Sequence, residues 1–292
     1  MYLVTGASGH LGQAVINHLL TTYKVPAGQI IATTREPQKL AALAAKGVVV
    51  RDANFDDEAH LVKAFAGANR LLLISTSSLE PGVRLKQHLN GVAAAAKSGV
   101  DHVVYTSMPN ATESLVSFAP DHVGTEKALA SSKLKGWTVL CNNWYFENLF
   151  MSMPQALKSG TQYSAAAQGK IAHIARDDLA RAAAAALVSD STAKKTHTLS
   201  GAKEFTTDEI AALVGKATGK SLKVVHVPVD GLIQGMIGAG LPEGMARVFA
   251  SFDAEIARGG LGGNSADYKA LTGSEPKSFE TWLKDNTSAF QA

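Results

Sequence analysis

The stretch Thr5-Gly6-Ala7-Ser8-Gly9-His10-Leu11-Gly12 lies between a short β-rich run at residues 2–4 and a helical pattern at residues 13–20. Glycines at this spacing suit a tight turn, a close approach of the backbone to a pyrophosphate, and close packing of the helix on the sheet. The free amides at the helix start, aided by the helix dipole, can then bind an anion. A glycine-rich turn without a ligand is the alternative. The position of this turn between the first expected strand and the first expected helix favours a dinucleotide site.

The first half of the chain alternates apolar β-rich runs with helical patterns. Expected strands are 2–4, 29–33, 48–51, 70–75, 102–106 and 137–141, and expected helices are 13–20, 38–46, 58–66, 85–97 and 125–130. Apolar strands that are each followed by a helix indicate a parallel sheet covered on both faces. The predicted fold class is therefore α/β, a Rossmann-type doubly wound parallel sheet with a smaller, mostly helical C-terminal substrate domain.

The end of the second expected strand indicates which dinucleotide is bound. NAD-specific sites usually carry Asp or Glu there. Here the sequence reads Ala32-Thr33-Thr34-Arg35-Glu36-Pro37, so that Arg35 is the first charged residue. A guanidinium can pair with a 2′-phosphate that a carboxylate would repel. We predict NADPH as the cofactor, against the alternative that Arg35 is a solvated surface residue. Glu36, one position late, is a weak counter-argument.

After residue 141 the strand–helix alternation weakens. We expect helices at 177–187 and 206–218, the second with a capping-box pattern of Thr206 and Glu209, short strands at 198–199 and 224–227, and a mostly helical stretch at 229–258. The predicted domains are an NADP-binding Rossmann domain over 1–145, completed by about 174–200, and a smaller substrate-side domain from 146–173 and 201–292.

Composition excludes several functional classes. The chain has 292 residues, 46% hydrophobic and 18% charged, which is ordinary for a globular protein. The net charge of +3 and the lack of a Lys/Arg cluster argue against a nucleic-acid partner. No apolar run approaches the ~20 residues of a membrane span. The single cysteine and the missing secretory pattern favour a cytoplasmic location. No metal-ligand spacing, P-loop or nucleophile elbow occurs, so we expect no metal.

Several further motifs occur in order along the chain. They are Arg35-Glu36-Pro37, Leu72-Leu73-Ile74-Ser75, Tyr105-Thr106-Ser107, Thr125-Glu126-Lys127 and Asn142-Asn143-Trp144-Tyr145-Phe146-Glu147-Asn148. With the glycine turn they resemble the NmrA-like atypical short-chain dehydrogenase family, and within it the bacterial NAD(P)H:quinone oxidoreductases of type 2 and the triphenylmethane reductases, over almost the whole chain. The resemblance implies hydride transfer from NADPH to a quinone or a similar flat, conjugated acceptor.

The resemblance also implies a set of cofactor-binding residues. These are Gly6, Ala7, Ser8, Gly9, His10 and Leu11 at the pyrophosphate, Arg35 at the 2′-phosphate, Ser75, Thr76 and Ser77 along the cofactor, and Val139, Leu140, Cys141, Asn142, Asn143 and Trp144 beside the nicotinamide. We expect His10 to be a loop residue rather than a catalyst. Cys141 stands where close relatives often have arginine, and we interpret it as a buried thiol.

The expected catalytic residues depart from the usual pattern. Ordinary short-chain dehydrogenases carry Tyr-x-x-x-Lys, whereas this chain has Val123 and Lys127 at those positions. Reduction of a quinone needs less acid catalysis, because the product is aromatic and water can supply the proton. Lys127 would bond the nicotinamide ribose, or it is a surface lysine. Asn142 would bond the carboxamide or the acceptor. Trp144 and Tyr145 would form a flat substrate wall, or they pack at the domain junction.

Two alternatives to this enzyme remain open. One is a non-catalytic NmrA-like protein that senses NADP(H), and the other, disfavoured by the missing tyrosine, is an epimerase or reductase of the extended branch. Asp101-His102 and Asp121-His122 are interpreted as surface pairs. Apolar helical surface allows a homodimer.

Overall fold

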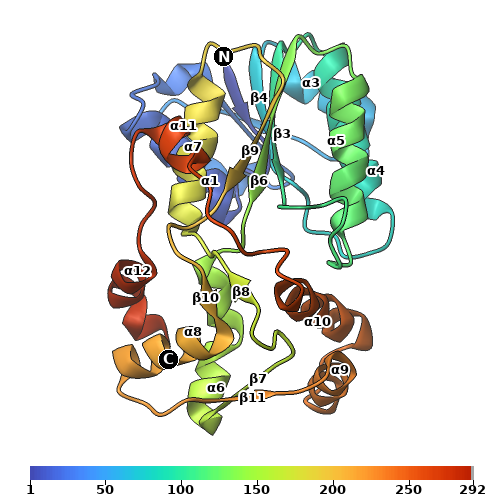
Figure 1. The fold of residues 1–292 in the computed structure, drawn as a ribbon. Helices are drawn as coiled ribbons and strands as arrows, with labels where there is room; N and C mark the ends of the chain where they lie inside the picture. Colours follow the sequence, from blue (N-terminus) through green and yellow to red (C-terminus); the bar gives the residue numbers. More distant parts are fainter. Residues whose placement is uncertain (291–292) are drawn as a thin grey trace.

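The computed structural model describes residues 1–290 and contains a seven-stranded parallel sheet (Figure 1). Its strand order is β3-β2-β1-β4-β5-β6-β9. The strands are β1 (Tyr2–Val4), β2 (Ile30–Thr34), β3 (Val49–Asp52), β4 (Arg70–Leu73), β5 (His102–Ser107), β6 (Gly136–Asn142) and β9 (Lys195–Leu199). The first six follow the Rossmann order, with β9 added at the edge. The predicted fold class is confirmed.

Helices cover both faces of the sheet, as Figure 1 shows. The first face carries α1 (His10–Thr21), α7 (Arg176–Val188) and α11 (Asp267–Thr272), and the second carries α3 (Glu58–Phe65), α4 (Val83–Lys97) and α5 (Ala119–Ser131). One buried apolar cluster joins α1 and α7 to the sheet, and another joins α3 and α4 to it. Side chains therefore alternate between two cores along each strand.

A second group of elements lies beyond the carboxyl ends of the strands, in the lower half of Figure 1. It comprises α6 (Met153–Ser159), β7 (Thr161–Ser164), β8 (Lys170–Ile171), β10 (Phe205–Thr206), α8 (Thr207–Thr218), β11 (Lys223–His226), α9 (Val229–Gly238), α10 (Glu243–Ala257) and α12 (Phe279–Asn286). Strands β7 and β11 pair in parallel, and β8 and β10 pair antiparallel. The chain enters this group after β6, returns to the sheet for α7 and β9, leaves it for β10 to α10, and returns once more for α11 before it ends with α12 and η4 (Thr287–Phe290).

Most of the expected elements form within a few residues of their predicted ends. The capping box of α8 is confirmed, because the Thr206 side chain accepts from the Glu209 amide and Glu209 accepts from the Thr206 amide. The single helix expected at 38–46 is wrong. It is divided into a 3-10 turn, η2 (Pro37–Leu40), and a short α2 (Ala41–Ala44). Leu40, at the break, leaves helical geometry and is buried in the core.

The remaining 3-10 turns are η1 (Ala27–Gln29), η3 (Phe146–Met151) and η4 (Thr287–Phe290). Among residues 1–290, none of the helices has both the length and the apolar character that crossing a bilayer requires.

Candidate functional site

The glycine turn after β1 has the geometry that a close backbone approach requires. Gly6 has a φ of +58°, in the left-handed region that glycine adopts most easily. The Gly9 amide donates to the Gly6 carbonyl at 3.0 Å and closes the turn. A Cβ on Gly12 would lie 2.8 Å from the Ala7 Cα, so a side chain there would force the helix away from the turn. The three glycines thus bring α1 directly onto the end of the strand.

The amides at the start of α1 point to an anion site. Within residues 1–290, the amides of His10, Leu11 and Gly12 meet no acceptor. The N-cap residue, Gly9, has no side chain to bond them. An α-helix leaves its first amides unpaired, and a phosphate oxygen satisfies them well. The hydroxyl of Ser8, in the turn, lies 2.8 Å from that of Thr34, at the end of β2, so a hydrogen bond joins the two.

Arg35 is exposed and directly follows β2, which is the position expected from the sequence. Glu36 is engaged elsewhere, because its carboxylate accepts from the Lys39 amine at 2.6 Å. Its backbone amide donates to the Thr34 hydroxyl at 3.2 Å. The acidic residue that argued against a 2′-phosphate is therefore paired with a cation of its own.

The loop that follows β4 lies beside the glycine turn, at the carboxyl ends of the strands. Its main-chain amides at Ile74, Ser75 and Thr76 donate to side chains rather than to other main-chain groups. Ser75 and Thr76 are partly buried, and Ser77 is exposed. The Thr76 Oγ1 atom is buried and has no hydrogen-bond partner within residues 1–290. A buried hydroxyl without a partner is costly unless a ligand meets it.

The end of β6 carries a second unpaired polar atom. The Asn142 side chain is buried, and its Oδ1 has no partner within the described residues. Asn143 behaves differently, because its Nδ2 donates to the Leu261 carbonyl at 3.0 Å and its Oδ1 accepts from the Trp144 amide at 2.7 Å. The Asn143 side chain therefore ties β6 to the chain after α10, whereas the Asn142 carbonyl oxygen is available to a ligand.

Cys141 is buried beside these amides. Val139 and Leu140, which precede it on β6, are buried in the two cores on opposite faces of the sheet. Burial raises the pKa of the Cys141 thiol to about 12, with the nearby Glu126 carboxyl as a further cause. The thiol is protonated at neutral pH and is a poor nucleophile.

The Glu126 carboxyl of α5 contacts the end of strand β5. The Glu126 Oε1 atom accepts a short hydrogen bond from the Ser107 hydroxyl at the end of β5. Burial raises the pKa of Glu126 above its ordinary value, and the Ser107 bond partly offsets this. Lys127 is exposed, and its amine has no partner within residues 1–290. Val123 packs among apolar groups, in the position where a catalytic tyrosine would otherwise stand.

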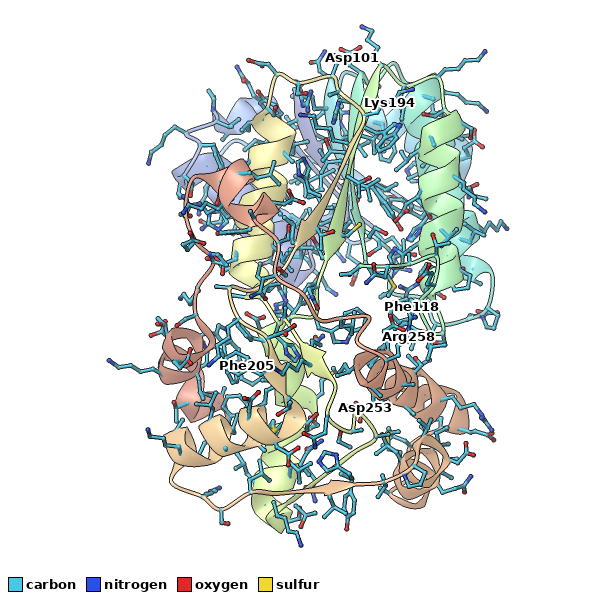
Figure 2. The ribbon with its side chains drawn as sticks, in the orientation of Figure 1. Asp101, Phe118, Lys194, Phe205, Asp253 and Arg258 are labelled. Atoms are coloured by element: carbon cyan, nitrogen blue, oxygen red, sulfur yellow. The ribbon has the colours of Figure 1, made fainter. Side chains whose placement is uncertain are left out.

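Aromatic side chains connect the segment after β6, the residue before α5 and helix α10. Trp144 meets Phe252 edge to face at 5.1 Å between ring centroids, and Phe252 meets Phe118 at 5.9 Å. Figure 2 labels Phe118, which directly precedes α5, on the side of the sheet that faces α10. All three rings are partly buried. Tyr145 lies instead against the first core, with the Arg176 guanidinium 5.5 Å from its ring.

The sequence interpretation was wrong about two histidines. His102 and His122 are buried rather than on the surface. His102 Nε2 lies 2.9 Å from the Thr138 hydroxyl, and His122 Nδ1 lies 2.7 Å from the Tyr105 hydroxyl. The signal that could have found His122 is Tyr105, a polar residue within an apolar strand that has to find a partner when buried.

His88, on α4, was also missed. Burial lowers its pKa to about 3, so the ring is neutral. It completes a buried polar cluster of His88, Tyr105, His122 and Thr125 between β5, α4 and α5. His10, in contrast, is exposed on the glycine turn.

The fold and the residues at this edge define a dinucleotide-binding protein of the atypical short-chain dehydrogenase type. The model of the NmrA-like family matches residues 2–283, and the chain belongs to that family. The expected family is thereby confirmed.

Relatives that are named as reductases or oxidoreductases match almost the whole chain. Quinone oxidoreductase 2 of Escherichia coli K12 is 40% identical over 273 residues, 94% of each chain. The crystal structure of an E. coli NADPH-dependent quinone oxidoreductase complexed with NADPH superposes with a TM-score of 0.91 at 38% identity, covering 99% of both chains. The Citrobacter sp. triphenylmethane reductase complexed with NADP(H) has a TM-score of 0.90 at 34% identity, covering 98% of this chain and 99% of that one.

Proposed function

We propose that this protein is an NADPH-dependent oxidoreductase that transfers hydride to a quinone or a similar flat, conjugated acceptor. The observation that carries the proposal is two buried polar atoms that have no hydrogen-bond partner within residues 1–290 and lie at the carboxyl ends of the strands. Thr76 Oγ1 and Asn142 Oδ1 are both buried, and each follows or ends a strand next to β5. They lie at the strand ends, where open α/β sheets bind their ligands.

The residues of the edge fit NADPH in a definite order. The amides of His10, Leu11 and Gly12 would bind the pyrophosphate, and Arg35 would pair with the 2′-phosphate. Asn142 Oδ1 would accept from the carboxamide of the nicotinamide, an amide to which a carbonyl oxygen is complementary. Bound there, NADPH supplies the hydride.

The acceptor side of the proposal rests on the aromatic border. Phe118, Trp144 and Phe252 offer partly buried faces and edges to a flat conjugated ring. Met236 and Ile237 of α9 do not join these rings, because they pack in a separate apolar cluster between α9 and α10. The three aromatic side chains would hold the acceptor by apolar contact and would orient it. This arrangement suits relatives that are named for quinones and for triphenylmethane compounds.

The proton that balances the hydride has a source on α5. In this proposal the Ser107 hydroxyl turns from Glu126 Oε1 to the reduced acceptor oxygen, gives its own proton there and takes the proton of the protonated Glu126 carboxyl in exchange, and water then reprotonates Glu126. Burial raises the pKa of the Glu126 carboxyl, so this group keeps its proton to a higher pH than an exposed glutamate does. Lys127, exposed one turn after Val123, would bind the nicotinamide ribose and add positive charge.

The test follows NADPH oxidation at the nicotinamide absorbance band with a panel of benzoquinones, naphthoquinones and cationic dyes. We expect oxidation only when an acceptor is present, and faster with NADPH than with NADH. Tight NADPH binding without turnover across the panel would instead favour the NADP(H)-sensing alternative. Absence of NADPH binding in calorimetry would refute the proposed function altogether.

A further inference from the structure

The loop after β4 is held in place by side chains from three different elements. The Ile74 amide donates to the Thr5 hydroxyl, the Ser75 amide to the Thr106 hydroxyl, and the Thr76 amide to His88 Nε2, each at 2.9 Å. Residues 74–79 form no helix or strand, so these amides have no regular main-chain acceptor. Each side chain therefore fixes one residue of the loop.

His88 can make its bond to the loop in only one protonation state. The Thr125 hydroxyl donates to the Asp121 carbonyl at 2.7 Å, so its oxygen is free to accept from His88 Nδ1 at 2.9 Å. His88 then carries its proton on Nδ1, and Nε2 keeps the lone pair that accepts from Thr76. The hydrogen-bond inventory of the buried cluster sets the tautomer.

A second side chain from α4 holds the other end of the same loop. Arg84, one turn before His88, donates from Nε to the Ser78 carbonyl at 3.0 Å. Its guanidinium carbon lies 4.3 Å from the Phe118 ring centroid, and Arg84 is itself buried. Helix α4 therefore holds both ends of residues 76–78, so that this short segment is pre-organised before any ligand binds.

We propose that His88 is a positioning residue for the bound dinucleotide. By accepting from the Thr76 amide it fixes the residue whose buried Oγ1 has no partner within residues 1–290, just beyond the carboxyl end of β4. This inference rests on the proposed function, because it takes NADPH as the ligand that meets Thr76. His88 itself is buried behind the loop and acts only through it.

Two conservative variants separate positioning from general structural support. In His88→Gln the amide oxygen reaches the place of Nε2 and can accept from Thr76, but the bond to Thr125 is lost. In His88→Asn the amide takes the place of Nδ1 and keeps the bond to Thr125, but the Thr76 amide loses its acceptor. Both variants replace the buried imidazole ring with a carboxamide side chain, so thermal unfolding should show similar losses of stability for the two.

The first measurement is hydrogen exchange of the Thr76 amide without cofactor. We expect protection to fall about tenfold or more in His88→Asn and to stay within about threefold in His88→Gln. This result does not depend on NADPH, so it tests the hydrogen bond even if the proposed function fails. Equal loss of protection in both variants would overturn the assignment.

The second measurement is the dissociation constant for NADPH. His88→Asn should weaken binding about tenfold, the worth of one buried hydrogen bond, and His88→Gln by no more than about twofold. Thr76→Val, which keeps the shape and the amide but removes the hydroxyl, should weaken binding as much as His88→Asn. Combined with His88→Asn it should add little, because both changes remove one contact. Wild-type affinity in Thr76→Val, or equal losses in the two His88 variants, would refute the positioning role.

Discussion

The Glu126 carboxyl and the Ser107 hydroxyl join the middle of α5 to the end of β5 by a direct hydrogen bond. Glu126→Gln keeps an oxygen that accepts from Ser107 but removes the proton that a carboxyl can give. We expect kcat to fall about tenfold or more, while the NADPH dissociation constant changes by less than about twofold. Steady-state kinetics and calorimetry check this. Unchanged kcat would mean that water supplies the proton directly.

Arg35 should discriminate between the two nicotinamide cofactors. Because its guanidinium is exposed after β2 and Glu36 is paired with Lys39, Arg35→Ala removes a charge without disturbing a contact of the fold. We expect NADPH binding to weaken about tenfold or more, the usual effect of a charge-assisted bond, and NADH binding to stay within about twofold. Arg35→Lys should recover part of the loss. Equal weakening of both cofactors would refute a contact with the 2′-phosphate.

Lys127 offers a test of function that leaves the fold intact. Its side chain is exposed and unpaired within residues 1–290, so Lys127→Ala should change the free energy of unfolding by no more than about 0.5 kcal/mol. If the amine binds the nicotinamide ribose, kcat/KM for NADPH should fall about tenfold. Lys133→Ala, also exposed and just beyond the end of α5, is the matched control. Equal kinetics of the two variants would exclude Lys127 from the site.

Gly12 should tolerate no side chain. In Gly12→Ala the new Cβ would lie 2.8 Å from the Ala7 Cα, so α1 has to shift. We expect a loss of about 1–3 kcal/mol of stability and weaker NADPH binding. Gly28→Ala is the control, since a Cβ there meets nothing within 4 Å. Urea unfolding and calorimetry measure both effects, and a stable Gly12→Ala variant with normal affinity would contradict the packing argument.

Buried neutral histidines make stability depend on pH. Burial lowers the pKa to about 3 for His88 and His122 and to about 4 for His102 and His173. The unfolded chain takes up protons on these rings below about pH 6.5 while the folded protein does not, so stability is complete above that pH and falls as the pH drops below it. Each ring contributes a slope of up to about 1.4 kcal/mol per pH unit. Urea unfolding at pH 7.5, 6.5 and 5.5 measures the combined slope.

His102→Gln provides the control for this pH dependence. The glutamine amide can keep the bond to Thr138 but has no ring to protonate, so the slope between pH 6.5 and 5.5 should fall by about a quarter. Asp121, Glu126 and Asp253 act in the opposite direction at lower pH, because burial raises their pKa values. A slope identical to that of the wild type would show that His102 is protonated in the folded protein.

The parts of the fold that local sequence determines were predictable. The glycine turn at 6–12, the apolar strands of the sheet and the capping box at Thr206 each depend on neighbours a few residues away. Strands β8 and β10 were not, because each has two residues and exists only by pairing with the other across the fold. The break at Leu40 likewise depends on a core that the local pattern does not contain.

The main-chain groups of the site were predictable from the sequence. The buried side chains that form hydrogen bonds with one another were not. Glu126 stands next to Lys127 in a motif that the sequence singles out, yet only the helical phase of α5 decides that Glu126 meets Ser107 while Lys127 is exposed. His122 and His102 follow aspartates and read as surface pairs, but tertiary packing turns both rings inward. Burial of a polar residue depends on a partner elsewhere in the chain, which spacing alone does not give.

The return of the chain to the sheet for α7 and β9 limits how the protein can be divided. Helix α7 packs along α1, with Leu179, Ala183 and Leu187 in the same core as Val15 and Leu19. A truncation after residue 145 would leave that face of α1 open to water and remove the edge strand β9. The half that holds the seven-stranded sheet is therefore built from separated pieces of the chain, since α11 also packs on α7 and β9, and transplanting that half into another protein would require every piece.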